Sequence, residues 1–131
     1  MVLTDKETSF IRQLISIRKR KEEKLLAQWR KLDEEQNKVK AERIQVYQLW
    51  SESRATLVDS EVNDNLLTRN ELNQLVSDKR SQYAQERAKA ESIIYLDKRI
   101  EQIECEKAEL IRQKISLVKG QEKLKGVLDE Q

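Results

Sequence analysis

Leucine and isoleucine recur every seventh residue in the second half of the chain. A seven-residue spacing keeps one face of an α-helix turned toward a partner, because 3.5 residues per turn matches a left-handed supercoil. A second row runs beside the first and starts at Ile93 and Ile100. The first row consists of Leu96, Ile103, Leu110, Leu117 and Leu124. The pattern predicts a long helix whose apolar seam needs a second helix to cover it.

The first half of the chain offers that second helix. Its main seam row is apolar except at Arg18, and its other row is half polar. Polar seam residues weaken a coiled coil, but they fix its register and orientation. The main row contains Ile11, Leu25, Leu32, Val39 and Val46, and the other row contains Ile15, Glu22, Trp29, Gln36, Arg43 and Trp50.

Two capping boxes predict where the helices begin. In Thr4-Asp5-Lys6-Glu7 and in Thr68-Arg69-Asn70-Glu71, a threonine and a glutamate three residues later satisfy each other's backbone N–H groups. The polar stretch between Ser51 and Thr68 competes with helix, and Asn63-Asp64-Asn65 is the expected turn. We expect helices over about 5–56 and about 68–126 and a turn over about 57–67. Gly120 and Gly126 are expected to fray the second helix near its end.

The predicted fold is all-α, with two long helices in an antiparallel coiled-coil hairpin that forms one domain over residues 1–131. Each helix would be about 75 Å long at 1.5 Å per residue. With the turn near Asn63, the numbers of facing residues should add up to about 126, which places Leu32 near Ile94, Leu25 near Glu101 and Ile11 near Ile115. A parallel homodimer of one long helix is the alternative.

Composition narrows the class of protein. Charged residues make up 38% of the chain, and it has no proline and two glycines, so the turn chemistry of a sheet is missing. Disorder is the competing interpretation of such a charge content, and the periodic apolar residues argue against it. No apolar run approaches the ~20 residues that span a bilayer, and Asp5, Lys6 and Glu7 interrupt any signal peptide. We expect a cytoplasmic protein that does not insert into a membrane.

Residues for catalysis are scarce. The chain has no histidine, which excludes a His-dependent triad and a His metal ligand. Its single cysteine, Cys105, falls outside the seam, where a bystander surface thiol is expected. Two separate glycines cannot build a phosphate-binding loop. We therefore expect no enzyme, no cofactor and no metal site.

Charge is unevenly distributed, although the net charge is only +2. Residues 9–24 carry six basic and two acidic residues, and residues 107–125 carry the same numbers. In an antiparallel hairpin the two segments would concentrate about +8 at the end that holds both termini, whereas residues 52–71 carry −3. Ordinary solvated faces explain such a pattern, and so do partners of opposite potential at each end. Nucleic acid fits less well, because glutamates separate the cations and no aromatic residues lie among them.

Apolar residues accumulate near the predicted turn. Leu57, Val58, Leu66 and Leu67 exceed what a two-helix seam can cover. They suggest either a partner contact or a local cap over the helix ends.

The chain resembles the central-stalk proteins of type III secretion systems, the FliJ/YscO-like family. The resemblance is carried by the run Leu14-Ile15-Ser16-Ile17-Arg18-Lys19-Arg20-Lys21-Glu22-Glu23-Lys24, by Tyr47-Gln48-Leu49-Trp50 before the turn, and by the size of the chain. It is nearest to the enteric, attaching-and-effacing type of injectisome.

The resemblance implies a hairpin whose terminal end enters the pore of a hexameric secretion ATPase, at the cytoplasmic face of a bacterial secretion apparatus. It further implies that the stalk stimulates assembly and ATP hydrolysis, that the opposite end reaches the export gate protein, and that secretion chaperones bind. ATPase contacts would fall on Arg12, Arg18, Lys19, Arg20, Lys21, Lys114, Lys119 and Lys123, and gate contacts on Trp50, Val58, Leu66, Leu67 and Leu72. A cytosolic coiled-coil scaffold or chaperone-binding protein without an ATPase role, and a helical RNA-binding arm, are the alternatives.

Overall fold

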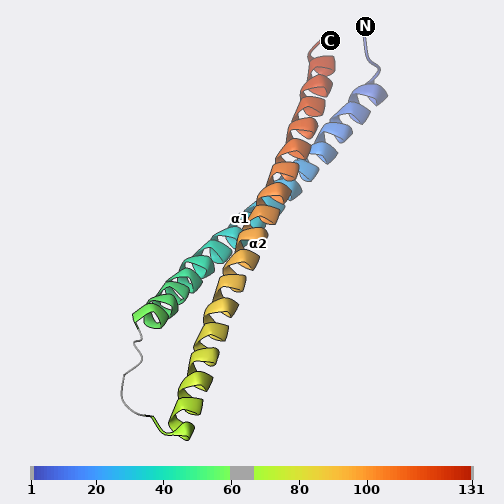
Figure 1. The fold of residues 1–131 in the computed structure, drawn as a ribbon. Coiled ribbons are helices and arrows are strands. Elements are labelled where there is room, and N and C mark those ends of the chain that lie inside the picture. Colours follow the sequence, from blue (N-terminus) through green and yellow to red (C-terminus); the bar gives the residue numbers. More distant parts are fainter. Residues whose placement is uncertain (1, 60–66, 131) are drawn as a thin grey trace. The chain divides into compact units, whose positions relative to one another are not determined.

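The computed structural model describes residues 2–59 and 67–130, and these residues form two helices and no strand. Helix α1 spans Asp5–Asp59 and helix α2 spans Arg69–Asp129. They pack against each other in antiparallel directions (Figure 1), as the all-α hairpin prediction required. The predicted turn at Asn63-Asp64-Asn65 lies outside the described residues.

Both capping boxes are confirmed. The Glu7 backbone N–H donates to the Thr4 hydroxyl at 3.2 Å, and the Thr4 N–H donates to the Glu7 carboxylate at 3.4 Å. Thr68 and Glu71 repeat both bonds, at 3.2 and 3.3 Å. Each box satisfies two of the backbone N–H groups that a helix leaves unpaired in its first turn.

Helix α1 continues past the polar residues that were expected to weaken it and reaches Asp59. The hydroxyl of Thr56 donates to the carbonyl of Glu52 at 2.9 Å, one turn earlier. A hydroxyl that bonds to the carbonyl one turn earlier destabilises its helix only slightly. The hydroxyl of Ser53 accepts a hydrogen bond from Lys89 of α2, so this polar side chain also supports packing between the helices.

The chain divides into two compact units, each built from both helices. The terminal unit consists of residues 1–36 and 102–131, and the loop unit of residues 37–101. In the terminal unit the seam buries Ile15 and Ile103, and in the loop unit it buries Leu96. The seam rows expected on both helices are buried or half-buried in each unit, Arg18 and Gln36 included.

The predicted register is wrong by about two heptads. Cross-helix hydrogen bonds join Asp33 to Lys107 and Gln36 to Glu104 in the terminal unit, and Arg43 to Asp97 in the loop unit. In each of these pairs the residue numbers add up to 140 rather than to about 126. A sum of 126 would have placed the seam residue Lys107 against Arg18 and Lys19, two like charges at a poorly solvated interface. A sum of about 126 requires that the first helix ends directly beside the first residue of the second helix.

Candidate functional site

A basic belt is the most distinctive charged feature of the terminal unit. It consists of residues 15–33 of α1 and residues 107–125 of α2. Contacts at both ends of the belt align these segments: Gln121 donates to Glu22 at 3.1 Å, and Lys107 donates to Asp33 at 2.8 Å. The first segment holds seven basic and three acidic residues and the second six and two, a total of +8.

The predicted register required the belt to lie at the extreme end of the unit. In the structure it lies farther from the termini. Residues 5–14 have balanced charges and residues 126–130 carry −2, so the turns next to the termini are not basic. On the other side of the belt, residues 34–36 and 102–106 carry −4. The charge of +8 is thus found on residues 107–125 together with residues 15–33 of α1 rather than with the predicted residues 9–24, and it lies between two segments of weak or negative charge.

The residues expected to contact an ATPase divide into two groups. Six are exposed and two are half-buried in the seam, and all except Arg12 belong to the belt. The exposed residues are Arg12, Lys19, Arg20, Lys21, Lys119 and Lys123, and the half-buried residues are Arg18 and Lys114. Exposed lysine and arginine side chains present their charge to a partner, whereas the two seam cations also pack between the helices.

Arg18 interrupts the apolar row because its side chain crosses the seam to Gly120. A Cβ atom at Gly120 would overlap the guanidinium of Arg18. The glycine therefore makes room for the arginine, and helix α2 continues through both glycines to Asp129. The helix does not end at Gly120, as the prediction of fraying would have it. Instead, a charged residue in an apolar row, Arg18, packs against a glycine within a helix, Gly120.

A buried polar cluster lies at the end of the belt nearest Gln36. Lys107 is only 8% exposed, and its ammonium group donates to Asp33 Oδ1 at 2.8 Å and to Gln36 Oε1 at 2.9 Å. Gln36, 2% exposed, donates in turn to Glu104 at 2.8 Å. The same ammonium group lies 4.6 Å from the centre of the Trp29 ring, within the range of a cation–π interaction.

The sequence contained a signal for this cluster. Lys107 falls seven residues after Ile100 and therefore continues the second seam row of α2, although its charge suggested a solvated position. A buried polar layer is satisfied only when its partners are level with each other, so it fixes the register of a coiled coil. We assign the cluster this structural role.

An apolar groove, the Trp29 groove, opens on one side of the belt. Its volume is about 250 Å³, and it is lined by Leu25, Leu26, Trp29, Leu110, Ile111 and Lys114. Leu26 and Ile111 remain partly exposed, Ile111 by 45%. The indole N–H of Trp29 is buried and has no hydrogen-bond partner among the described residues. The heptad spacing predicts that Trp29 lies in the seam, but it does not predict a groove beside it.

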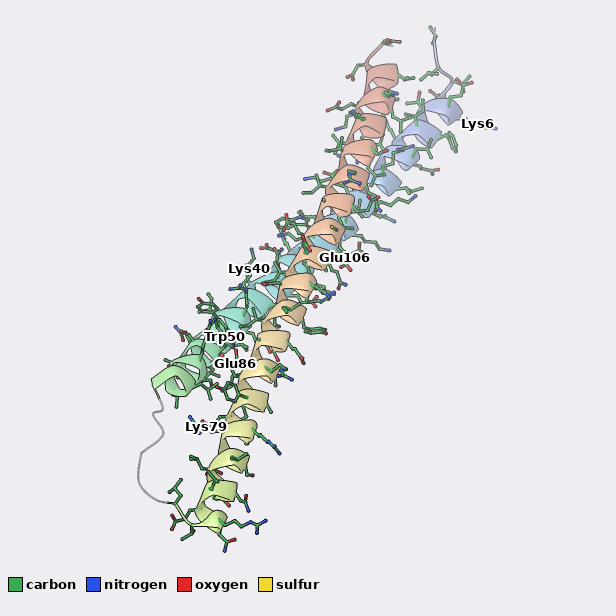
Figure 2. The ribbon with its side chains drawn as sticks, in the orientation of Figure 1. Lys6, Lys40, Trp50, Lys79, Glu86 and Glu106 are labelled. Carbon is green, nitrogen blue, oxygen red and sulfur yellow. The ribbon has the colours of Figure 1, made fainter. Side chains whose placement is uncertain are left out.

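The residues expected to contact an export gate are only partly brought together. Trp50 packs between the helices of the loop unit and donates its indole N–H to Glu86 at 2.7 Å, and Figure 2 labels both residues. Leu67 and Leu72 are exposed by 39% and 49%. Leu66 and the side chain of Val58 lie outside the described residues. Trp50 is thus mainly a packing residue, and the exposed leucines are the better contact candidates.

Aromatic and basic side chains alternate along α1 in the loop unit. The Tyr47 and Trp50 rings lie 5.6 Å apart, with Arg43 over the first and Arg54 over the second. Arg43 also forms a two-bond pair with Asp97, whose hydrogen bond and charge raise the pKa of Arg43. The side chains of Arg43 and Asp97 are 36% and 50% exposed, so water screens the pair and it contributes little to stability. Trp50 therefore serves packing within the unit, whereas Tyr47 remains 47% exposed.

Within residues 2–59 and 67–130 no group of three or more cysteine or acidic side chains is arranged to hold a metal ion. Cys105 is an exposed free thiol. Neither described helix contains a segment apolar enough and long enough to cross a membrane.

Comparison with protein-family models, with curated proteins and with solved structures finds no match to this chain. The basic belt and the Trp29 groove are therefore the features on which a functional proposal can rest.

Proposed function

We propose that this chain is the central stalk of a type III secretion ATPase, a protein without catalytic activity of its own. The observation that carries the proposal is the basic belt of +8 on the paired helices of the terminal unit. The resemblance of residues 14–24 and 47–50 to the FliJ/YscO-like family supports it. No cofactor is needed for this role.

The dimensions of the terminal unit suit a ring lumen. A pair of packed helices is about 20 Å across, because one helix with its side chains is about 10 Å in diameter. Inside a hexamer such a pair cannot contact all six subunits equally, because it has no sixfold symmetry. The stalk would therefore bind some ring states more tightly than others, and only such a difference in affinity can shift their populations. In this way it would stimulate hexamer assembly and ATP hydrolysis.

The exposed cations of the belt would contact the ring. Lys19, Arg20 and Lys21 lie next to one another on α1, and Lys119 and Lys123 lie on the segment of α2 beside them. A concentration of positive charge attracts an acidic surface and orients the two proteins before they dock. We assign Arg18 and Lys114 a secondary part, because both side chains are half-buried in the seam.

At the loop unit, we propose contacts with the export gate protein through Leu67 and Leu72, and with secretion chaperones. Both leucines are exposed beside the start of α2 at Arg69. Exposed apolar residues near one another are typical of protein contact sites. The protein would then work at the cytoplasmic face of a bacterial secretion apparatus, where the ATPase and the gate meet.

The test exchanges charge inside and outside the belt. The triple variant Lys19→Glu, Arg20→Glu, Lys21→Glu reverses three exposed belt cations, and stimulation of the purified secretion ATPase should fall at least about tenfold at about 0.15 M salt, where distant charges are screened. The control variant Lys38→Glu, Lys40→Glu, Lys98→Glu makes the same change of charge at exposed positions of the loop unit. It should leave stimulation unchanged. Equal stimulation by both variants would remove the belt from the mechanism.

A scaffold without an ATPase role is the second candidate. The exposed residues Ile44, Tyr83 and Tyr95 of the loop unit favour it, because exposed apolar and aromatic side chains bind partners without any ring. Purification of the chain from cells separates the two functions. A stalk co-purifies with a hexameric ATPase, and a scaffold co-purifies with other proteins alone.

A further inference from the structure

The Trp29 groove combines an apolar lining with one cation that has no partner among the described residues. Leu25, Trp29, Leu110 and Ile111 supply most of the lining, and Lys114 lies at its edge. Lys114 is half-buried, and the described residues give its ammonium group neither an ion pair nor a hydrogen bond. We propose that this groove binds an acidic amphipathic helix from a partner protein, with a large apolar side chain in the groove and a carboxylate on Lys114.

The size of the groove favours a side chain over a small-molecule ligand. Its volume of about 250 Å³ falls below the ~300–1,000 Å³ of sites that enclose small molecules. The groove is open along the helices, and exposed Ile115 extends its apolar edge one turn beyond Ile111. A strip of this kind between two packed helices suits the apolar face of a third helix, with anchors spaced three or four residues apart.

Charge decides which helix binds. The groove lies within the belt of +8. A neutral helix would gain no electrostatic attraction there, and a basic helix would be repelled. Lys114 is partly desolvated, and a carboxylate beside it would form a stronger pair than one at a fully exposed lysine. The site does not depend on an ATPase, and it therefore goes beyond the proposed function.

The experiment uses a designed probe and the full-length chain. The probe is a fluorescein-labelled helical peptide of about 21 residues, three heptads with leucine and phenylalanine on one face and glutamate elsewhere. A second peptide replaces every glutamate with glutamine. Fluorescence anisotropy at about 0.15 M salt should show that the chain binds the acidic peptide at least about tenfold more tightly than the glutamine peptide.

Two variants and a control locate the binding site. Ile111→Ser and Lys114→Gln should each weaken binding of the acidic peptide at least about tenfold, whereas Ile94→Ser should not change it. Ile94 is a matched control because it is an exposed isoleucine on the same helix but in the loop unit. Circular dichroism checks that each variant keeps its helix content.

Three results would overturn the proposal. The first is that the acidic peptide does not bind, and the second is that all the variants bind it equally well. The third concerns a second copy of the chain as the occupant. If sedimentation shows that the chain alone is a dimer and that Ile111→Ser makes it a monomer, the groove is an interface between copies.

Discussion

Replacement of Lys107 by methionine tests how much the buried polar cluster stabilises the fold. The substitution keeps an unbranched side chain of similar length and removes the ammonium group from Asp33 and Gln36. Asp33 is 38% exposed and can be hydrated, but Gln36 is 2% exposed. Its carbonyl oxygen then loses the hydrogen bond from the charged Lys107, and the loss of such a bond at a buried group costs about 1–3 kcal/mol.

We therefore expect Lys107→Met to lower the free energy of unfolding by about 1–3 kcal/mol. Urea unfolding followed by circular dichroism gives this quantity. The control is Lys98→Met, an exposed lysine of the same helix, and it should stay within about 0.5 kcal/mol of the parent chain, as surface substitutions usually do.

The double variant Gln36→Leu, Lys107→Met sharpens the test. Replacement of both partners by apolar groups of similar shape is often nearly neutral, so the double variant should recover most of the stability lost by Lys107→Met. Two results would refute the reasoning. One is that Lys107→Met is as stable as Lys98→Met, and the other is that the double variant is no more stable than Lys107→Met.

The remaining predictions concern the helix ends, a glycine and salt. Thr68→Ala removes the side-chain bond to the Glu71 N–H and should cost about 1 kcal/mol in thermal unfolding, whereas exposed Thr56→Ala, at a position within α1, should cost less. Gly120→Ala should stabilise the chain by at most about 1 kcal/mol through helix propensity, because the flexible end of Arg18 can move from the new methyl group. A loss of more than about 1 kcal/mol would show that the arginine is held there. The proposed binding of the belt to a secretion ATPase should weaken steadily as salt is raised, and an affinity independent of salt concentration would contradict an electrostatic contact.

The fold followed from spacing because seven-residue repeats constrain the helix face directly. Rows such as Leu96 and Ile103 predicted which side of α2 is buried, and Thr4 and Thr68 predicted where the helices begin. Such local signals depend only on a few neighbouring residues. They are readable without knowledge of the partner helix.

The register could not be predicted in the same way, because every shift by a heptad keeps apolar rows in contact. What distinguishes the shifts is the pairing of exceptional residues, such as Lys107 with Asp33 or Arg18 with Gly120. In the sequence of one helix alone, each of these residues only interrupts the apolar or helical pattern. The position of the basic belt depends on the same shift, and for this reason the sequence paired residues 107–125 with residues 9–24 rather than with residues 15–33.

The register of the terminal unit is the claim on which the belt depends, and one pair of distances tests it. Arg20, Cys105 and Lys119 are exposed and lie on the outer faces of their helices. Spin labels on Arg20→Cys and Lys119→Cys, with Cys105→Ser, should be closer together than labels on Arg20→Cys and native Cys105. The two positions on α2 differ by about 21 Å along the helix at 1.5 Å per residue. A shorter distance from residue 20 to Cys105 than to residue 119 would contradict the register and separate the two halves of the basic belt.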